Sequence, residues 1–190
     1  RVAQHFRRTI YPVLTPLAVD PGHPFPFISD LSLSLAVELV HPARPGVQFA
    51  RLKVPTGRGR WIALEEPGHF IPVERVIAHH MNELFPGTTV ESVHAFRVAR
   101  NADLWREEDD VEDLLQTISE ELRERRFAPA IRLEVEDGAP ASVVDLLCSE
   151  LDLDPTLDVY RTAGLVDYAD LRTLADLDRD RKSTRLNSSH

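Results

Sequence analysis

The stretch LSLSLAVELV, residues 31–40, decides the fold class of this chain. Leucine and valine occupy all of its odd positions and alternate mainly with smaller or polar residues, which is the period of a half-buried β-strand. Two further strands are predicted over residues 47–54 and 60–64, and the turn-forming sequence PTGRG, residues 55–59, separates them. Together the three strands predict an antiparallel meander.

On the N-terminal side, residues 10–28 carry five prolines, which lack a backbone N–H and disfavour helix at the preceding residue. Apolar residues lie between these prolines, so we expect an extended, irregular segment that packs on the domain. Residues 2–8 resemble the middle of a helix. We therefore expect residues 1–11 to be the end of a helix from a preceding domain.

On the C-terminal side, apolar residues take up helical spacing from Val73 to Phe85, and Pro86-Gly87 ends that helix. Strands are then predicted over residues 90–99, 130–135 and 157–160, and helices over residues 107–126, 140–151 and 168–177. The helix over residues 107–126 starts with acidic residues and ends with arginines, which complements its dipole. The prediction is an α+β domain, with one largely antiparallel sheet and amphipathic helices packed mainly on one face.

The composition excludes several classes of function. The net charge of the 190 residues is −9, whereas affinity for nucleic acid is built mainly from Lys and Arg, so we expect no nucleic-acid partner. The single cysteine, Cys148, excludes an intrachain disulfide and is predicted to be a buried helix residue. No apolar run approaches the roughly 20 residues that cross a bilayer, so we expect a cytoplasmic protein without a transmembrane segment.

Few residues are candidates for chemistry. The eight glycines show no phosphate-loop spacing. The stretch TGRGR, residues 56–60, is interpreted as a hairpin turn, which we prefer to the alternative of a phosphate cradle. His79 and His80 are adjacent, so on a helix they point about 100° apart and are not expected to share a metal. The acidic run over residues 107–113 fits a helix start better than a magnesium site. Arg97 and Arg100 remain, because their guanidinium groups suit phosphate oxygens.

Four stretches of the sequence carry a resemblance to a known family. In chain order they are YPVLTPLAVD (11–20), HPFPFIS (23–29), FRVARNADL (96–104), and RR (125–126) followed by IRLEV (131–135). These stretches resemble the middle, or head, region of the bacterial polyphosphate kinase family, and the resemblance spans nearly all of residues 1–181. One departure is Ala99, where the family usually has Thr, so a hydroxyl is missing beside Arg100.

The resemblance implies an enzyme that transfers the terminal phosphate of ATP to inorganic polyphosphate, reversibly and with Mg²⁺, through a phosphohistidine. Family members carry an N-terminal helical domain that contacts the nucleotide, the head domain, and two phospholipase D-like domains with the nucleophilic histidine. Residues 12–181 correspond to the head domain. We therefore expect no catalytic residue, metal, ATP or Mg²⁺ in this chain and no activity from it alone. Residues 182–190 do not fit the family and are expected to be a disordered, non-native tail.

The resemblance also implies a role for this part of the enzyme. The head domains of the family interlock between subunits, so the chain is expected to serve homo-oligomer assembly. It is further expected to line the rim of the polyphosphate tunnel, with Arg97, Arg100 and Asn101 as candidate phosphate contacts. ATP and ADP would bind through the other domains, and membrane association of the full-length enzyme is a further expectation. The alternative is a stand-alone anion-binding or dimerisation module without catalysis.

Overall fold

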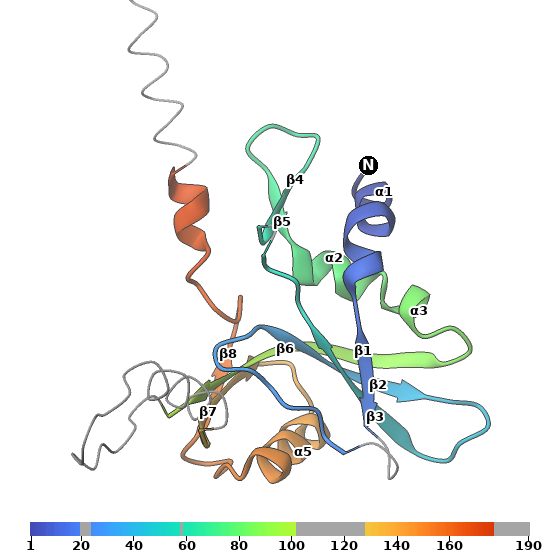
Figure 1. Cartoon of the computed structure of the whole chain (residues 1–190), viewed down its shortest axis with the longest axis vertical. Coiled ribbons are helices and arrows are strands. Elements are labelled where there is room, and N and C mark those ends of the chain that lie inside the picture. Colours follow the sequence, from blue (N-terminus) through green and yellow to red (C-terminus); the bar gives the residue numbers. More distant parts are fainter. Residues whose placement is uncertain (20–23, 58, 102–127, 177–190) are drawn as a thin grey trace, which may run out of the picture.

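The structure, a computed structural model, describes residues 1–19, 24–57, 59–101 and 128–176. Its centre is a six-stranded sheet with the order β1-β3-β2-β6-β7-β8 (Figure 1). All neighbouring strands are antiparallel except β7 and β8, which run parallel. The strands are β1 Pro16–Val19, β2 Ser34–Val40, β3 Val47–Lys53, β6 Thr89–Arg100, β7 Ala130–Glu136 and β8 Val159–Thr162. The predicted α+β class with a largely antiparallel sheet is confirmed.

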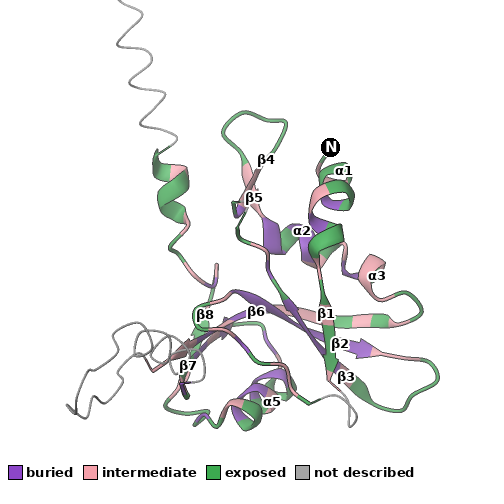
Figure 2. Ribbon diagram, viewed as in Figure 1, coloured by how far each residue is buried: buried purple, intermediate pink, exposed green. Residues whose placement is uncertain are grey.

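The sheet is covered on both faces, because alternate residues of its central strands enter two separate cores. Leu35 and Val37 of β2 belong to a core that also holds Val76 of helix α2. Ala36, which lies between them, belongs to a second core with Leu147 of helix α5. We name the two sides the α2 face and the α5 face. Figure 2 shows buried residues concentrated on the central strands, where the two cores meet the sheet.

Most described helices lie on the α2 face, as predicted. Helix α1 (Val2–His5) continues into a π-helix (Phe6–Ile10) and a 3-10 turn (Tyr11–Val13), and buries Phe6 and Ile10 in the α2-face core. Helices α2 (Val73–His79) and α3 (Met81–Leu84) lie on the same face and correspond to the helix predicted from Val73. Helix α5 (Ala141–Leu151) alone among the described helices covers the other face.

The prediction that residues 60–64 form the third strand of the meander is wrong. Strand β4 (Trp61–Ala63) pairs with β5 (Phe70–Pro72) in a separate two-stranded sheet. The reason is that β3 already has β1 on one side and β2 on the other, so its edges are both taken. Strand β1 itself was not predicted, because it lies in the proline-rich segment. Pro16 begins it at the edge of the sheet, where a missing N–H disrupts no ladder.

The last part of the described chain crosses from one face to the other. Strand β7, helix α5 and strand β8 form a parallel crossover unit, and α5 lies on the α5 face. After β8, however, Val166 is buried in the core of the α2 face. Residues 163–170 therefore lead from the end of β8, the edge strand, to the α2 face and on to a helical stretch over residues 171–176.

Some predictions lie outside the described residues. They are the helix over residues 107–126, with its acidic run, and the tail over residues 182–190. Within the described ranges, no helix combines the length and the apolar character needed to cross a membrane.

Candidate functional site

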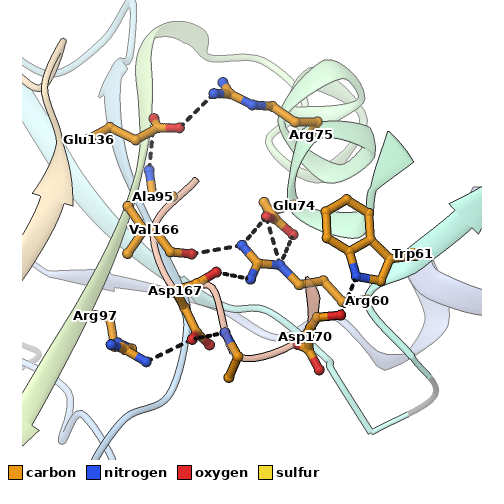
Figure 3. A network of polar contacts seen from close by, with 11 residues as sticks. Arg60, Trp61, Glu74, Arg75, Ala95, Arg97, Glu136, Val166, Asp167 and Asp170 are labelled. Atoms are coloured by element: carbon orange, nitrogen blue, oxygen red, sulfur yellow. Dashed lines mark hydrogen bonds and ion pairs between the residues drawn. The ribbon is translucent and has the colours of Figure 1, made fainter. Parts of the chain in front are cut away.

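A network of polar side chains lies on the α2 face, where residues 163–170 meet β4, α2 and β6 (Figure 3). We call it the Arg60 network and define it by Arg60, Trp61, Glu74, Arg97 and the segment 166–170. Its members come from parts of the sequence more than 100 residues apart. The network fixes the segment by which the described chain leaves the sheet.

Arg60 and Glu74 form a buried ion pair at the centre of this network. Their exposed fractions are 2% and 3%. The Arg60 Nε donates to Oε1 of Glu74 at 2.9 Å, and Nη2 donates to the same oxygen. Breaking such a pair by removing one partner costs about 3–5 kcal/mol, because the other charge is left buried and unpaired. Arg60 and Glu74 therefore tie the start of β4 to the first turn of α2.

The remaining hydrogen-bond donors of the Arg60 network hold the segment after β8. Nη2 of Arg60 donates to the carbonyl oxygen of Val166 at 2.7 Å, and Nη1 donates to that of Asp167. The indole Nε1 of Trp61 donates to the carbonyl oxygen of Asp170 at 2.9 Å. Backbone carbonyls that leave regular structure need such partners when they are buried. Arg60, directly before β4, and Trp61, the first residue of β4, thus fix three residues of the segment.

Asp167 links Arg60 and Trp61 to strand β6. Its φ of 70° lies in the left-handed region, which Asp tolerates better than most side chains because it bonds its own local backbone. One carboxylate oxygen accepts the N–H of Ala169 at 3.0 Å and lies 2.9 Å from Nη1 of Arg97. Asp167 therefore shapes the bend of the segment and anchors it to the sheet with the same side chain.

Arg97, a residue predicted to contact phosphate, is paired with two carboxylates. It lies directly across from Glu134 in the β6–β7 ladder, and its Nη2 lies 2.8 Å from Oε2 of that residue. Its Nη1 reaches Asp167, and 19% of the side chain is exposed. A phosphate group at this position would compete with both carboxylates.

Arg100 and Asn101, the other two predicted site residues, are not brought together with Arg97. The Arg100 guanidinium donates to the carbonyl oxygens of Ile28 and Ala128 at 2.9 and 2.6 Å, and it lies over the Phe27 ring. Ile28 belongs to the α5-face core, whereas Arg97 lies two residues from Ala95 of the α2-face core and contacts Asp167, beside Val166 of the same core. Burial lowers the pKa of Arg100, and the charge of Asp30 opposes that shift.

Asn101 directly follows β6. Its backbone N–H donates to the carbonyl oxygen of Pro129 at 3.0 Å. This bond extends the contact between the end of β6 and the start of β7. The arrangement around Arg100 and Asn101 holds the proline-rich segment and the entry to β7 against the sheet.

A second cluster attaches the N-terminal helix. Nε and Nη2 of Arg7 donate to the two carboxylate oxygens of Glu83, each at 3.0 Å, and Nδ1 of His80 lies 2.9 Å from Oε1 of Glu83. The Phe6 ring stacks on His80 with centroids 4.4 Å apart. The hydrogen bond from Arg7, followed by that from His80, lowers the pKa of Glu83 to about 2.

The cysteine and the adjacent histidines considered in the sequence analysis pack against other residues of the fold. Cys148 is buried in α5, as predicted, and burial followed by nearby aspartates raises the pKa of its thiol. His79 and His80 lie edge to face, with ring centroids 5.0 Å apart. Within the described ranges, no three histidine, cysteine or acidic side chains gather into a metal-binding group.

Sequence reasoning missed the pairing of Arg60 with Glu74. Arg60 was placed in a turn and at the start of the strand predicted over residues 60–64, and Glu74 was not singled out. A signal was present in the sequence, because Glu74 lies beside Val73 and two residues before Val76, on the part of the helix that becomes buried. Its partner could not be identified, since the β4–β5 hairpin that brings the two together was not predicted.

Residues 1–174 match the family described as the polyphosphate kinase middle domain. The polyphosphate kinases of Mycolicibacterium gilvum and Streptomyces coelicolor are 46% and 49% identical to this chain, with 94% and 92% of the chain covered. The same matches cover 25% and 23% of those relatives, so the chain spans about a quarter of their length.

A solved structure gives the same answer. The crystal structure of polyphosphate kinase from Porphyromonas gingivalis is similar with a TM-score of 0.65 and 25% sequence identity. The likeness covers 92% of this chain and 24% of that chain. Sequence and fold therefore agree over the same part of the molecule, and this chain belongs to the polyphosphate kinase family, within which it corresponds to the middle domain.

Proposed function

We propose that this chain is the structural middle part of an enzyme that transfers the terminal phosphate of ATP to inorganic polyphosphate. The observation that carries the proposal is the match to the polyphosphate kinase middle domain over residues 1–174. The chain spans about a quarter of the relatives named above. We therefore assign the chemistry to the rest of the enzyme and no catalytic residue to this chain.

For the whole enzyme we propose ATP as phosphate donor, Mg²⁺ as cofactor and a phosphohistidine as intermediate. A covalent intermediate splits one difficult transfer into two easier steps. Stabilising the transferred phosphoryl group requires cationic groups that are available to it. In this chain Arg60 and Arg97 are engaged with carboxylates, which supports placing the reacting groups outside the Arg60 network.

For this chain we propose a role in assembly. The Arg60 network holds residues 166–170 against the sheet, and through them it sets the direction in which the polypeptide continues. We further propose that the domain contributes to a homodimer and to the rim of the polyphosphate path. Contact of Arg97, Arg100 and Asn101 with polyphosphate stays a prediction, and their internal hydrogen bonds favour a structural contribution.

A chimera tests the proposal. Residues 1–174 are placed in the Streptomyces coelicolor polyphosphate kinase in place of the matching segment, and synthesis of polyphosphate from ATP and Mg²⁺ is measured beside the isolated chain. We expect synthesis by the chimera and none by the chain alone. Robust synthesis by the isolated chain would place the active site within it, and a folded but inactive chimera would remove the proposed role.

The alternative of a stand-alone anion-binding or dimerisation module predicts a different pair of results. Light scattering on the isolated chain would show a dimer, while the chimera would fold without activity. Retention on immobilised polyphosphate, compared with an Arg97→Ala and Arg100→Ala double variant whose fold is checked by circular dichroism, tests the predicted phosphate contacts. Equal retention of both proteins would exclude these arginines as contacts.

A further inference from the structure

Arg51 is a buried cation that lacks a carboxylate partner within the described residues. Its exposed fraction is 5%. Nε and Nη2 both donate to the hydroxyl oxygen of Ser34, at 3.2 and 3.1 Å, and these are its only hydrogen bonds in the described part of the chain. Arg60, which is buried to a similar degree, has Glu74 as counter-charge. Arg51 thus differs from Arg60, the other buried arginine among the described residues.

An unpaired buried charge is costly. Moving a guanidinium out of water without an opposite charge destabilises a fold, and such charges are usually paired or bind an anion. Burial lowers the pKa of Arg51, and no carboxylate of the described residues raises it again. Arginine nevertheless remains protonated in proteins. The domain therefore carries a positive charge that its described residues do not neutralise.

Arg51 lines a pocket of about 530 Å³. In the described chain no buried side-chain nitrogen or oxygen lacks a hydrogen-bond partner. Nη1 of Arg51 makes no such bond there, so this atom is not fully buried, and Arg51 is among the residues that line the pocket. Lys53, Thr15 and Thr56 also line the pocket, and none of its lining residues is acidic. In a protein of net charge −9, this lining carries two positive charges and no negative one.

The strand register explains how the two cations come together. Arg51 and Lys53 lie two residues apart on β3, so their side chains leave the same face of the sheet. Leu17 of β1 pairs with Arg51, and Ser34 of β2 pairs with Lys53. The neighbouring strands thus offer an apolar side chain and a hydroxyl beside the cations. The turn over residues 55–57 closes the pocket at the end of β3.

We propose that the pocket formed by Arg51 and Lys53 binds a phosphate-type oxyanion. The free side of a guanidinium beside an ammonium group matches the geometry and charge of phosphate oxygens, and threonine hydroxyls add neutral donors. The anion supplies the missing counter-charge of Arg51. The site is separate from Arg97 and Arg100, and it does not depend on the proposed kinase function, because an inactive chain can still bind the anion.

Binding is measured on the purified chain as the rise of its thermal unfolding midpoint with ligand, since an anion that binds only the folded state stabilises it. The probes are inorganic phosphate, tripolyphosphate and long-chain polyphosphate, each compared with sodium chloride at the same ionic strength. We expect a rise with at least one phosphate probe and none with chloride. A response to inorganic phosphate identifies a site for the free ion, and a response confined to the two longer probes identifies a site for a chain.

Two variants test the residues, and a third is the control. Lys53→Gln is expected to weaken binding about tenfold, the usual effect of losing one charged hydrogen bond. Arg51→Met is expected to abolish binding while the unfolding midpoint without ligand stays equal or rises, since a buried unpaired charge is replaced by an apolar side chain. Arg132→Gln removes an exposed charge on β7, outside the residues that line the pocket, and is expected to bind like wild type.

The outcomes separate binding from folding. A site is excluded if the wild-type chain shows no response to any phosphate probe, or if Lys53→Gln and Arg132→Gln weaken binding equally. If Arg51→Met binds as tightly as wild type, Arg51 is not a ligand of the anion. Should Arg51→Met unfold, Lys53→Gln decides the matter, because Lys53 lies at the exposed end of β3 and its replacement leaves the core intact.

Discussion

At the scale of single residues, the domain contains charged side chains that are buried and shape the fold through their hydrogen bonds. Arg60 and Glu74 illustrate this, since both are almost fully buried and both have their hydrogen bonds satisfied by protein groups. Such a pair stabilises less than its short distances suggest, because desolvation of the two charges offsets much of the attraction. Its main effect is on geometry. The guanidinium donates at once to Glu74 of α2 and to the carbonyls of residues 166 and 167, which fixes these parts relative to β4.

A double-mutant cycle tests this view of the ion pair. Arg60→Met or Glu74→Leu alone leaves one buried charge unpaired and is expected to lower the free energy of unfolding by about 3–5 kcal/mol. The double variant is expected to recover much of that loss. Urea unfolding measures all four proteins, and Arg75→Gln, which removes a half-exposed partner of Glu136, serves as control with an effect of about 1 kcal/mol or less. Equal losses in single and double variants would contradict the coupling.

Glu83 gives a prediction about pH. Its pKa in the folded chain is about 2, below its usual 4.5, so the folded state binds fewer protons in that range. The stabilisation is therefore complete above about pH 4.5 and is lost as the pH falls towards 2. We expect the difference in unfolding free energy between wild type and Glu83→Gln to be constant near neutral pH and to shrink across this window. Glu65→Gln, at an exposed position, is the control. A difference that stays unchanged at low pH would contradict the assignment.

For the predicted site residues, the sequence indicated their place on a strand but not their partners. Two arginines near a strand end were correctly placed on β6, yet their partners are a cross-strand glutamate, an aspartate 70 residues onward and two backbone carbonyls. None of these partners lies close to Arg97 or Arg100 in the sequence. Spacing along the chain identifies a cation, but whether that cation is already neutralised depends on tertiary contacts.

At the scale of elements, the periodic segments were predictable and the pairing of strands was not. Apolar spacing located β2, β3, β6 and β7 and helices α2 and α5, because each buries a regular face. Pattern alone does not say which strand lies beside which. The insertion of β3 between β1 and β2, and the parallel pairing of β8, are set by contacts distant in sequence.

The segment after β8 gives a prediction at this scale. In the Arg60→Met, Glu74→Leu double variant the carbonyls of Val166 and Asp167 lose their donors, even where global stability is recovered. We expect the amides of residues 166–170 to exchange hydrogen faster than in wild type, because local opening needs less free energy when such contacts are lost. Exchange in α5, on the opposite face, serves as internal reference and should be unchanged. Unaltered exchange at residues 166–170 would show that Arg60 does not hold the segment.

At the scale of the whole molecule, the two cores share one sheet, so we expect the domain to unfold as a unit. Cys148, the single cysteine of the chain, reports on this because it is buried against the sheet. Burial raises the pKa of its thiol, and the thiolate is the reactive form. Labelling with a thiol reagent is therefore expected to be slow in native buffer and to accelerate in parallel with global unfolding in urea. Fast labelling of the native chain would indicate that α5 opens by itself.

The return of residues 163–170 to the α2 face has a consequence for how the domain can be joined to others. Helix α1 packs on the α2 face, and Val166 brings the chain back to that same face before residues 171–176 (Figure 1). Both ends of the described chain are thus anchored on one side of the sheet. A domain built in this way can be inserted into a longer polypeptide through two connections on the same side of the sheet. The surface over α5, on the opposite side, is then free of both connections.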